Sequence, residues 1–283
     1  MIHKKIPFPF EGKNNASLTL YCQTPNDGQL LQRRATILVI PGGGYGSVSY
    51  REAECVALKF CSVGYNAAVL DYSVYPDALF PQSLCEASLA ISHLKENAKE
   101  YNIDPERIVT CGFSAGGHLA LSLGAFWNQT WLSERVGKAT DLLRPAAQIL
   151  CYPVVSSDPK IAHLKSFERI LGENPNKEYE KMVSLENQVN ENMPATFLWS
   201  SFTDNAVPCE NSLILAQKLK EKDVPLEFHL YGWAPHGLSL ADRTVETEKS
   251  ILLEKEKRYE NPHVATWFPL CTQWLDYLFE GIC

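Results

Sequence analysis

The sequence predicts an α/β protein with a mostly parallel central sheet and helices on both faces. Short apolar runs alternate with longer amphipathic ones along the 283 residues, which is the pattern of strands that alternate with helices. Hydrophobic residues make up 45% and charged residues 21%, the balance of a globular protein that buries a sizeable core. No internal repeat and no Gly/Ser-rich linker divides the chain, so we expect a single domain over residues 1–283.

The first half of the chain alternates regularly. The run 36–40 (TILVI) is rich in β-branched residues and ends at Pro41 and three glycines, as a strand does before a turn. The amphipathic run 51–63 ends at Gly64, a common residue just past the end of a helix. The other expected strands are 17–22, 66–70 and 107–111. The other expected helices are 82–101 and a segment from about 112 to 126.

The second half repeats this alternation after a less regular stretch. Expected strands are 146–151, 195–200 and 226–231, and expected helices are 165–171, 208–221 and 264–279. Residues 152–193 carry only the short helix at 165–171, so we expect them to form a small cap-like insert. The charged stretch 246–260 mixes both signs, which indicates a solvated helix face.

Composition and charge indicate the cellular compartment of the protein and the kinds of partner it binds. The net charge of −7 disfavours binding to nucleic acid, and no apolar run approaches the ~18 residues that a membrane helix needs. The first residues contain lysines but no apolar signal segment, which indicates a cytoplasmic protein. The nine cysteines are odd in number and contain no CxxC pair. We therefore expect free thiols, with no disulfide framework and no metal site.

A G-x-S-x-G pattern follows the strand 107–111. Gly112, Ser114 and Gly116 stand where this strand is expected to turn into a helix. A nucleophilic serine needs such a sharp turn, and glycines let the backbone bend without a Cβ clash. The helix that follows directs its positive end at a developing oxyanion. The alternative is a small-residue turn that only lets the strand and the helix pack closely.

A glycine-rich segment, PGGGYG at 41–46, follows the strand 36–40. It lacks the lysine of one phosphate-binding fingerprint and the third glycine of the other. We expect the backbone N–H groups of Gly43 and Gly44, with that of Ala115, to form an oxyanion hole. A plain tight turn is the alternative.

The base and the acid are sought at the carboxyl ends of strands, where chemistry gathers in such sheets. His236 lies in the loop after the strand 226–231 and is the expected base. His118 lies on the helix of the serine itself and is expected to be a packing residue. Asp204 follows the strand 195–200 and is the expected acid. Asp71 also ends a strand, but it precedes the serine, which breaks the usual order Ser…Asp…His.

Four segments together resemble one enzyme family: PGGGYG, CGFSAGGHLA, SSFTDNAVP and PHG, between about 36 and 236. They are similar to the esterase/lipase branch of the α/β-hydrolases, near the hormone-sensitive-lipase-like and bacterial acetyl-xylan-esterase-like carboxylesterases. The resemblance implies the α/β-hydrolase fold and a serine carboxylesterase that needs no cofactor. Pro41 stands where the hormone-sensitive-lipase pattern has histidine, which favours the acetylesterase-like group, whose members often act on acetylated sugars.

The substrate expected is a small-molecule ester with a short acyl group, acetyl first, on a carbohydrate such as an acetylated xylo-oligosaccharide. Tyr45, Tyr75 and Trp233 fall near expected strand ends, where aromatic rings can stack on sugars. A serine peptidase on the same fold and a non-catalytic binding protein are the alternatives. The oligomeric state is left open.

Overall fold

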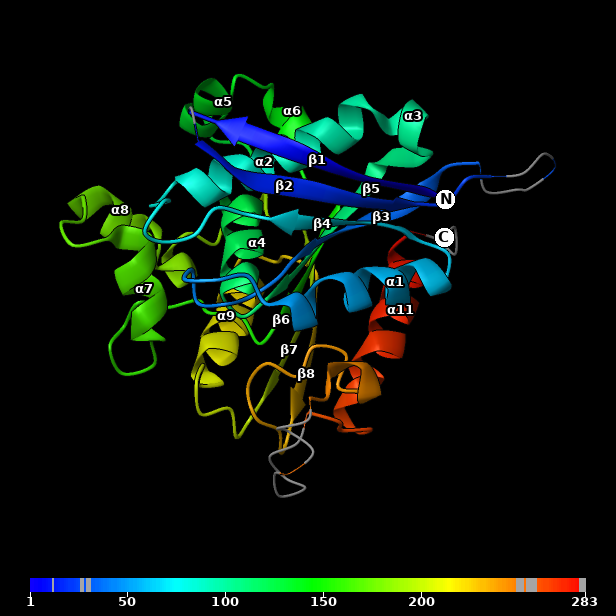
Figure 1. Ribbon diagram of the computed structural model, residues 1–283. Helices are drawn as coiled ribbons and strands as arrows, with labels where there is room; N and C mark the ends of the chain where they lie inside the picture. Colours follow the sequence, from blue (N-terminus) through cyan, green and yellow to red (C-terminus); the bar gives the residue numbers. More distant parts are fainter. Residues whose placement is uncertain (12, 26–27, 29–31, 248–251, 253–258, 280–283) are drawn as a thin grey trace.

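An eight-stranded sheet runs through the computed structural model, which describes residues 1–11, 13–25, 28, 32–247, 252 and 259–279 (Figure 1). The strand order is β1-β2-β4-β3-β5-β6-β7-β8. The pairs β1–β2 and β2–β4 are antiparallel, and all others are parallel. The strands are β1 (Ile2–Phe10), β2 (Lys13–Cys22), β3 (Arg34–Ile40), β4 (Asn66–Asp71), β5 (Ile103–Phe113), β6 (Ala147–Cys151), β7 (Ala195–Ser201) and β8 (Leu226–Tyr231).

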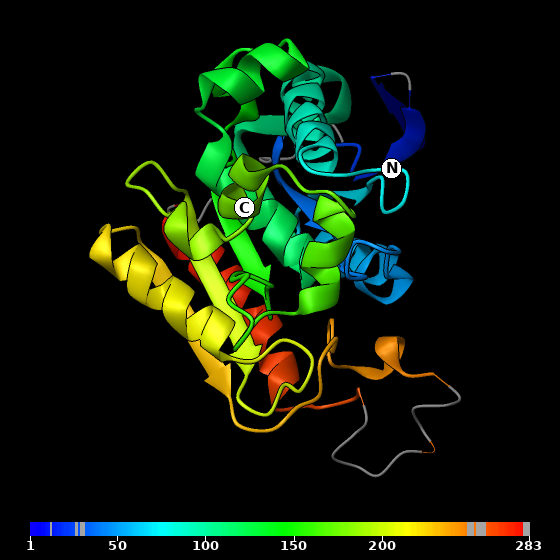
Figure 2. The same ribbon diagram turned by 90° about the vertical axis from the view of Figure 1, so that its left-hand side faces the viewer.

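Helices cover both faces of the sheet. On one face lie α1 (Glu54–Ser62) and α11 (Trp267–Leu278), which share a buried apolar cluster. On the other face lie α2 (Gln82–Glu96), α4 (Ala115–Phe126) and α9 (Glu210–Glu221), as Figures 1 and 2 show. The other helices of the described residues are α3 (Ala98–Tyr101), α5 (Thr130–Val136), α6 (Thr140–Leu143), α7 (Leu164–Leu171), α8 (Lys177–Met182) and the short 3-10 turns η1 (Tyr50–Glu52), η2 (Leu185–Asn187), η3 (Arg243–Val245) and η5 (Val264–Thr266). The prediction of an α/β fold with a mostly parallel sheet is confirmed.

Several boundaries differ from the prediction. Strand β1 is not predicted by its sequence, because IHKKIPFPF carries two lysines and two prolines. It is nevertheless an edge strand, where a missing N–H donor is tolerated. The helix expected over 82–101 is divided at Asn97 into α2 and α3. Helices α5, α6 and α8 are also absent from the prediction, and α8 gives the segment 152–193 a second α-helix besides α7.

Two predictions concern residues that the structure describes only in part. Most of the charged stretch 246–260 lies outside the described residues. Eight cysteines are free thiols in the structure, and Cys283 lies outside the described part. Among the residues that the structure describes, no helix is long and apolar enough to cross a membrane.

The parallel strands end along one edge of the sheet. Ser114 follows β5, Asp204 follows β7, His236 follows β8, and the glycine segment 41–46 follows β3. The segment 152–193 connects β6 to β7 and carries α7 and α8. It packs against α4 through His118, whose imidazole is hydrogen-bonded to the carbonyl of Val183. The fold therefore brings four loops from distant parts of the sequence to one site.

Candidate active site

Ser114 occupies a strained turn between β5 and α4. Its φ of 53° and ψ of −117° lie in a region that residues with a Cβ rarely adopt. Backbone hydrogen bonds fix the turn on both sides: the Ser114 N–H donates to Cys151 O at 3.0 Å. The Ser114 carbonyl accepts from the amides of His118 at 3.0 Å and Val154 at 3.1 Å. The turn thus presents the Ser114 hydroxyl at the carboxyl edge of the sheet.

Both glycines of the G-x-S-x-G pattern are required by close packing. A Cβ on Gly112 would lie 2.3 Å from the carbonyl oxygen of Gly116. A Cβ on Gly116 would lie 2.1 Å from the carbonyl oxygen of Ile40 on β3. The atoms that would clash belong to the backbone, so neither position has room for a side chain.

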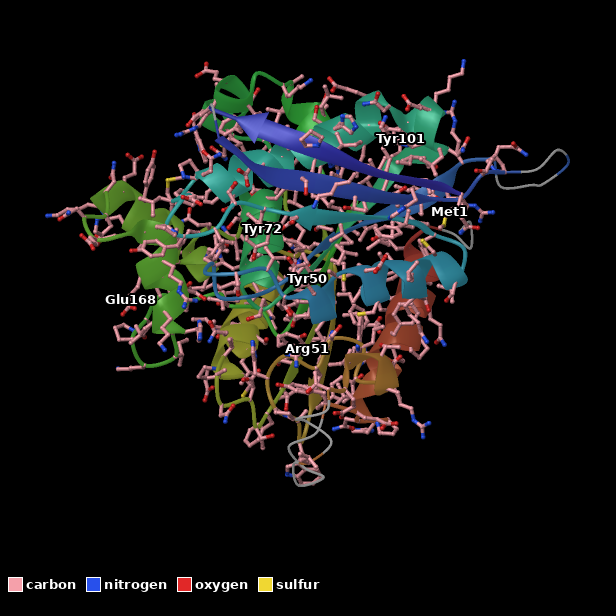
Figure 3. All side chains as sticks on the ribbon, viewed as in Figure 1. Met1, Tyr50, Arg51, Tyr72, Tyr101 and Glu168 are labelled. Atoms are coloured by element: carbon pink, nitrogen blue, oxygen red, sulfur yellow. The ribbon has the colours of Figure 1, made fainter. Side chains whose placement is uncertain are left out.

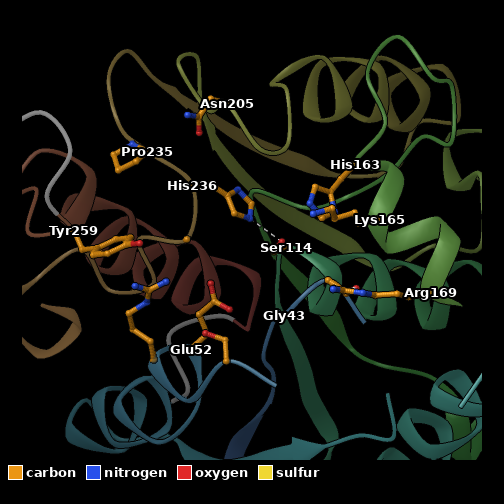
Figure 4. Close-up of a pocket in the computed structure, with 14 residues that line it drawn as sticks. Gly43, Glu52, Ser114, His163, Lys165, Arg169, Asn205, Pro235, His236 and Tyr259 are labelled. Atoms are coloured by element: carbon orange, nitrogen blue, oxygen red, sulfur yellow. Dashed lines mark hydrogen bonds between the residues drawn. The ribbon is translucent and has the colours of Figure 1, made fainter. Parts of the chain in front are cut away.

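A continuous hydrogen-bonded chain joins the three predicted catalytic side chains (Figure 4). His236 Nε2 lies 2.8 Å from Ser114 Oγ, and His236 Nδ1 lies 2.7 Å from Asp204 Oδ2. The Asp204 side chain is 1% exposed, and its Oδ1 accepts from the amides of Ala206 and Val207 at 2.9 Å each. Because the carboxylate only accepts, Nδ1 carries the proton and Nε2 is the acceptor for the Ser114 hydroxyl.

The glycine segment turns beside Ser114. Gly43 and Gly44 have φ values of 128° and 59°, and both line the same pocket as Ser114. The amide of Ser49 donates to Gly42 O at 2.9 Å and that of Gly46 to Gly43 O at 3.1 Å, which closes the turn. Within the described part of the chain, the amides of Gly43, Gly44 and Ala115 have no protein acceptor. These three N–H groups are therefore free to bind an oxygen of a ligand.

Glu52 and Tyr152 support the site and are absent from the prediction. The carboxylate of Glu52 is buried and accepts from Gly42 N–H at 2.9 Å and from the Tyr152 hydroxyl at 2.7 Å. The ring of Tyr152 packs edge-on against His236, with centroids 5.0 Å apart. Burial, followed by the nearby Glu52 charge, raises the pKa of Tyr152 well above its usual value, so the hydroxyl stays protonated. The only sequence signal is that Tyr152 directly follows a buried strand.

The pocket above Ser114 has a volume of about 510 Å³. Its lining combines polar and apolar surface and includes several charged side chains. Figure 4 shows His163, Lys165 and Arg169 on one side of Ser114 and Glu52 with Tyr259 on the other. The lining residues are Gly43, Gly44, Ser49, Arg51, Glu52, Ser114, His163, Lys165, Arg169, Asn205, Pro235, His236, Gly237 and Tyr259.

The three aromatic residues expected to contact substrate lie elsewhere. Tyr45 is 2% exposed, and its hydroxyl is hydrogen-bonded to His118 Nδ1 at 2.7 Å, so its ring has no free face for a ligand. Tyr75 lines an adjoining cavity of about 330 Å³. Trp233 is 81% exposed and is not among the described residues that line the pocket.

The two alternative residues for base and acid lie outside the hydrogen-bonded chain. His118 is fully buried on α4, where burial lowers its pKa to about 4 and keeps the imidazole neutral. Asp71 lies 3.8 Å from the ammonium of Lys5 near the antiparallel edge of the sheet. The structure thus brings Ser114, His236 and Asp204 together and leaves the two alternatives apart.

The chain is similar in sequence to known proteins. The sequence pattern of the BD-FAE family matches residues 23–219. Endo-1,4-beta-xylanase B of Butyrivibrio fibrisolvens is 36% identical over 214 residues, which cover 74% of this chain and 33% of that protein. The chain therefore spans about a third of the length of that relative.

Two solved structures are similar along nearly the whole chain. The acetyl ester-xyloside bifunctional hydrolase from Caldicellulosiruptor lactoaceticus is 35% identical with a TM-score of 0.77, and the match covers 95% of this chain and 89% of that one. The carboxylesterase Cest-2923 from Lactobacillus plantarum WCFS1 is 25% identical with a TM-score of 0.85, and the match covers 100% and 99%. These similarities support ester hydrolysis over the two alternatives, a peptidase and a binding protein.

Proposed function

The chain belongs to the BD-FAE family of α/β-hydrolases and is a carboxylic ester hydrolase, and we propose that Ser114, His236 and Asp204 are its catalytic triad. The resemblance to esterases of the α/β-hydrolase fold is confirmed at the level of family and reaction. The assignment of the triad rests on one observation above all. The hydrogen-bonded chain from Asp204 through His236 ends on a serine hydroxyl at the floor of a pocket.

The proposed reaction is a two-step acyl transfer. The Ser114 hydroxyl oxygen attacks the ester carbonyl while His236 Nε2 accepts its proton. Asp204 orients the imidazole and stabilises its charged form. The amides of Gly43, Gly44 and Ala115 donate to the oxyanion of the tetrahedral intermediate. His236 then protonates the leaving alcohol, and a water molecule activated by the same base releases the acid from Ser114.

The proposed substrates are short-chain esters, with acetyl on a carbohydrate as the leading case. A similar structure is described as an acetyl ester-xyloside hydrolase, which supports this choice. The charged side chains in the lining of the pocket suit a small acyl group better than a long alkyl chain. In this proposal the protein is one domain, and the insert 152–193 is a small cap beside the pocket.

The first experiment compares Ser114→Ala with wild-type protein on p-nitrophenyl acetate. We expect kcat to fall by roughly 10⁴–10⁶ with no loss of fold by circular dichroism. Labelling by a fluorophosphonate should disappear in the same variant. Ser62→Ala, on the exposed side of α1, is the control and should keep both properties. Wild-type turnover in Ser114→Ala would show that another residue is the nucleophile.

The second experiment tests the acyl group. We expect kcat/KM to decrease from p-nitrophenyl acetate to butyrate to octanoate, because a long alkyl chain would have to lie against the charged side chains of the pocket. A preference for octanoate would contradict the proposed acetyl selectivity and leave the triad assignment intact. Release of acetate from acetylated xylo-oligosaccharides would then test the carbohydrate part directly.

A further inference from the structure

The pocket carries a charge opposite to that of the whole protein. The chain has a net charge of −7, yet the pocket is lined by three permanent cations: Arg51, Lys165 and Arg169. Glu52 is the carboxylate that shares this lining, and both of its oxygens already accept hydrogen bonds within the protein. A low-dielectric cleft lined by one sign of charge attracts ligands of the other sign.

The guanidinium of Arg169 is built into the glycine segment. Its Nη1 donates to the carbonyl oxygen of Gly44 at 3.1 Å. A Cβ on Gly46 would lie 2.5 Å from Arg169 Cζ, although Gly46 itself has no left-handed φ. Glycine at 46 is therefore required by space, because the guanidinium occupies the position of a side chain. This packing holds one cation next to the proposed oxyanion hole.

These cations are not neutralised by the described part of the protein. Among the described residues, no carboxylate lies within ion-pair distance of Arg51, Lys165 or Arg169. Glu168 and Glu173 line the adjoining cavity with Arg169 without forming such a pair, and Glu168 is exposed on α7 (Figure 3). These cations thus keep a net positive charge to offer to a ligand.

Arg51 differs from the two cations of α7. Its guanidinium lies 3.9 Å from the centroid of the Tyr259 ring, and its Nε is buried without a hydrogen-bond partner among the described residues. One face of this group is already used by the aromatic ring. Lys165 and Arg169, on the other side of Ser114, are the more available pair (Figure 4).

The positive potential extends to the histidines of the pocket. Burial is the main cause that lowers the pKa of His163, and electrostatic interactions with His236, Arg169 and Lys165 lower it further. The Asp204 carboxylate acts in the opposite direction. His163 therefore lies within reach of both the α7 cations and the proposed catalytic histidine.

We propose that this pocket selects esters that carry a carboxylate, which Arg169 and Lys165 bind while the ester carbonyl lies over Ser114. The inference rests on the proposed function, because it assumes that the ester reacts at Ser114. On the alcohol side the carboxylate belongs to an acidic sugar such as a uronic acid. On the acyl side it belongs to a dicarboxylic half-ester. Both sources present the same anionic group to the same two cations.

The test compares two matched pairs of esters in the intact protein. For the acyl side, 4-nitrophenyl hemisuccinate is compared with 4-nitrophenyl methyl succinate. For the alcohol side, 4-acetoxybenzoate is compared with methyl 4-acetoxybenzoate. The readout is the ratio of kcat/KM for the anionic ester to that for its neutral partner. We expect this ratio to decrease with added NaCl in at least one pair, because salt screens attraction between charges.

Three variants then identify the groups responsible. Lys165→Gln and Arg169→Gln should each lower the anionic-to-neutral ratio by roughly threefold to tenfold, the effect of one partly exposed charged contact. Gly46→Ala should lower it as well without removing any charge, because its Cβ displaces the guanidinium. Lys220→Gln, on the exposed side of α9 and paired with Asp223, is the charge-matched control and should leave the ratio unchanged.

The outcomes separate the two proposals. The pair of esters that responds shows whether the carboxylate lies in the acyl or the alcohol part. Equal ratios in wild type, Lys165→Gln and Arg169→Gln for both pairs would overturn the charge selectivity. If neutral esters are still hydrolysed through Ser114, the proposed function survives that result. If hydrolysis is independent of Ser114, the proposed function itself fails.

Discussion

Replacing Glu52 by glutamine tests how the glycine segment is held beside Ser114. The carboxylate accepts from two buried donors, Gly42 N–H at 2.9 Å and the Tyr152 hydroxyl at 2.7 Å. The Tyr152 oxygen also accepts from the amide of Ser239 at 2.8 Å, so this hydroxyl cannot reorient without losing a partner. A glutamine has the same shape but only one accepting oxygen. One of the two donors must then face an NH₂ group.

The magnitude follows from these contacts. A hydrogen bond to a charged group contributes about 1.5–3 kcal/mol, and a buried donor left unpaired costs about 1–3 kcal/mol. We therefore expect Glu52→Gln to lower the free energy of unfolding by about 2–4 kcal/mol. The amide of Gly42 precedes the proposed oxyanion donors, and removal of one such donor costs ~10²–10³ in rate. A displaced loop still stabilises the oxyanion in part, so the loss is smaller than for complete removal of a donor. We therefore expect kcat to fall by roughly tenfold to a hundredfold.

The assay is urea unfolding followed by tryptophan fluorescence, with kcat measured on p-nitrophenyl acetate. Glu54→Gln is the matched control, since Glu54 is exposed two residues away and accepts only from the Tyr21 hydroxyl at 3.1 Å among the described residues. It should change the free energy of unfolding by less than about 1 kcal/mol. Wild-type stability and wild-type kcat in Glu52→Gln would refute the role assigned to this carboxylate.

Three further predictions concern the proposed acid Asp204, Gly116 in the turn after Ser114, and the buried His118. Asp204→Asn should lower kcat on p-nitrophenyl acetate by roughly 10⁴, because the amide no longer holds the correct tautomer of the base; an unchanged kcat would remove Asp204 from the triad. Gly116→Ala should destabilise the protein in urea by about 3 kcal/mol, whereas Gly232→Ala, whose added methyl group would have no described atom within 4 Å, should stay within about 0.5 kcal/mol. Because burial lowers the pKa of His118 from 6.5 to about 4, the unfolded chain binds a proton that the folded protein does not bind between these pH values. The free energy of unfolding should therefore fall by about 3 kcal/mol as pH decreases through this window, and His118→Gln should lack this part of the decline.

The strands that carry the site were predictable because their sequences are locally unambiguous. TILVI in β3 and the run before Gly112 in β5 are apolar, β-branched and closed by glycine. The edge strand β1 has no such pattern, since its lysines and prolines interrupt the apolar run, although the strand pairs with β2 and buries Phe8 and Phe10 in the core. The division between α2 and α3 at Asn97 likewise depends on contacts, because the Asn97 amide nitrogen bonds back to the carbonyl of His93.

The positions of Ser114, Asp204 and His236 could be predicted for a topological reason. Each follows a parallel strand, and parallel strands end at one edge, so their loops converge whatever the side-chain packing is. No such topological rule predicts the contacts that support the site from other parts of the chain. Glu52 and Tyr152 are 100 residues apart, and Gly44 and Arg169 are 125 apart. Tyr45 shows the reverse case: it follows Gly44 with a φ of 56°, which turns its ring into the core toward His118.

The glycine segment 41–46 links rate and selectivity in one loop. The Glu52 carboxylate accepts a hydrogen bond from Gly42 N–H. The Arg169 guanidinium, on α7, donates to the Gly44 carbonyl and packs against Gly46. Between these two supports lie the amides that are proposed to bind the oxyanion. A change on the Glu52 side displaces those amides for every ester and should lower kcat for neutral and anionic substrates alike. In the proposal, the Lys165 charge on α7 is one that only an anionic substrate uses. The two supports should therefore separate experimentally, with Glu52→Gln leaving the anionic-to-neutral ratio nearly constant while Lys165→Gln lowers it.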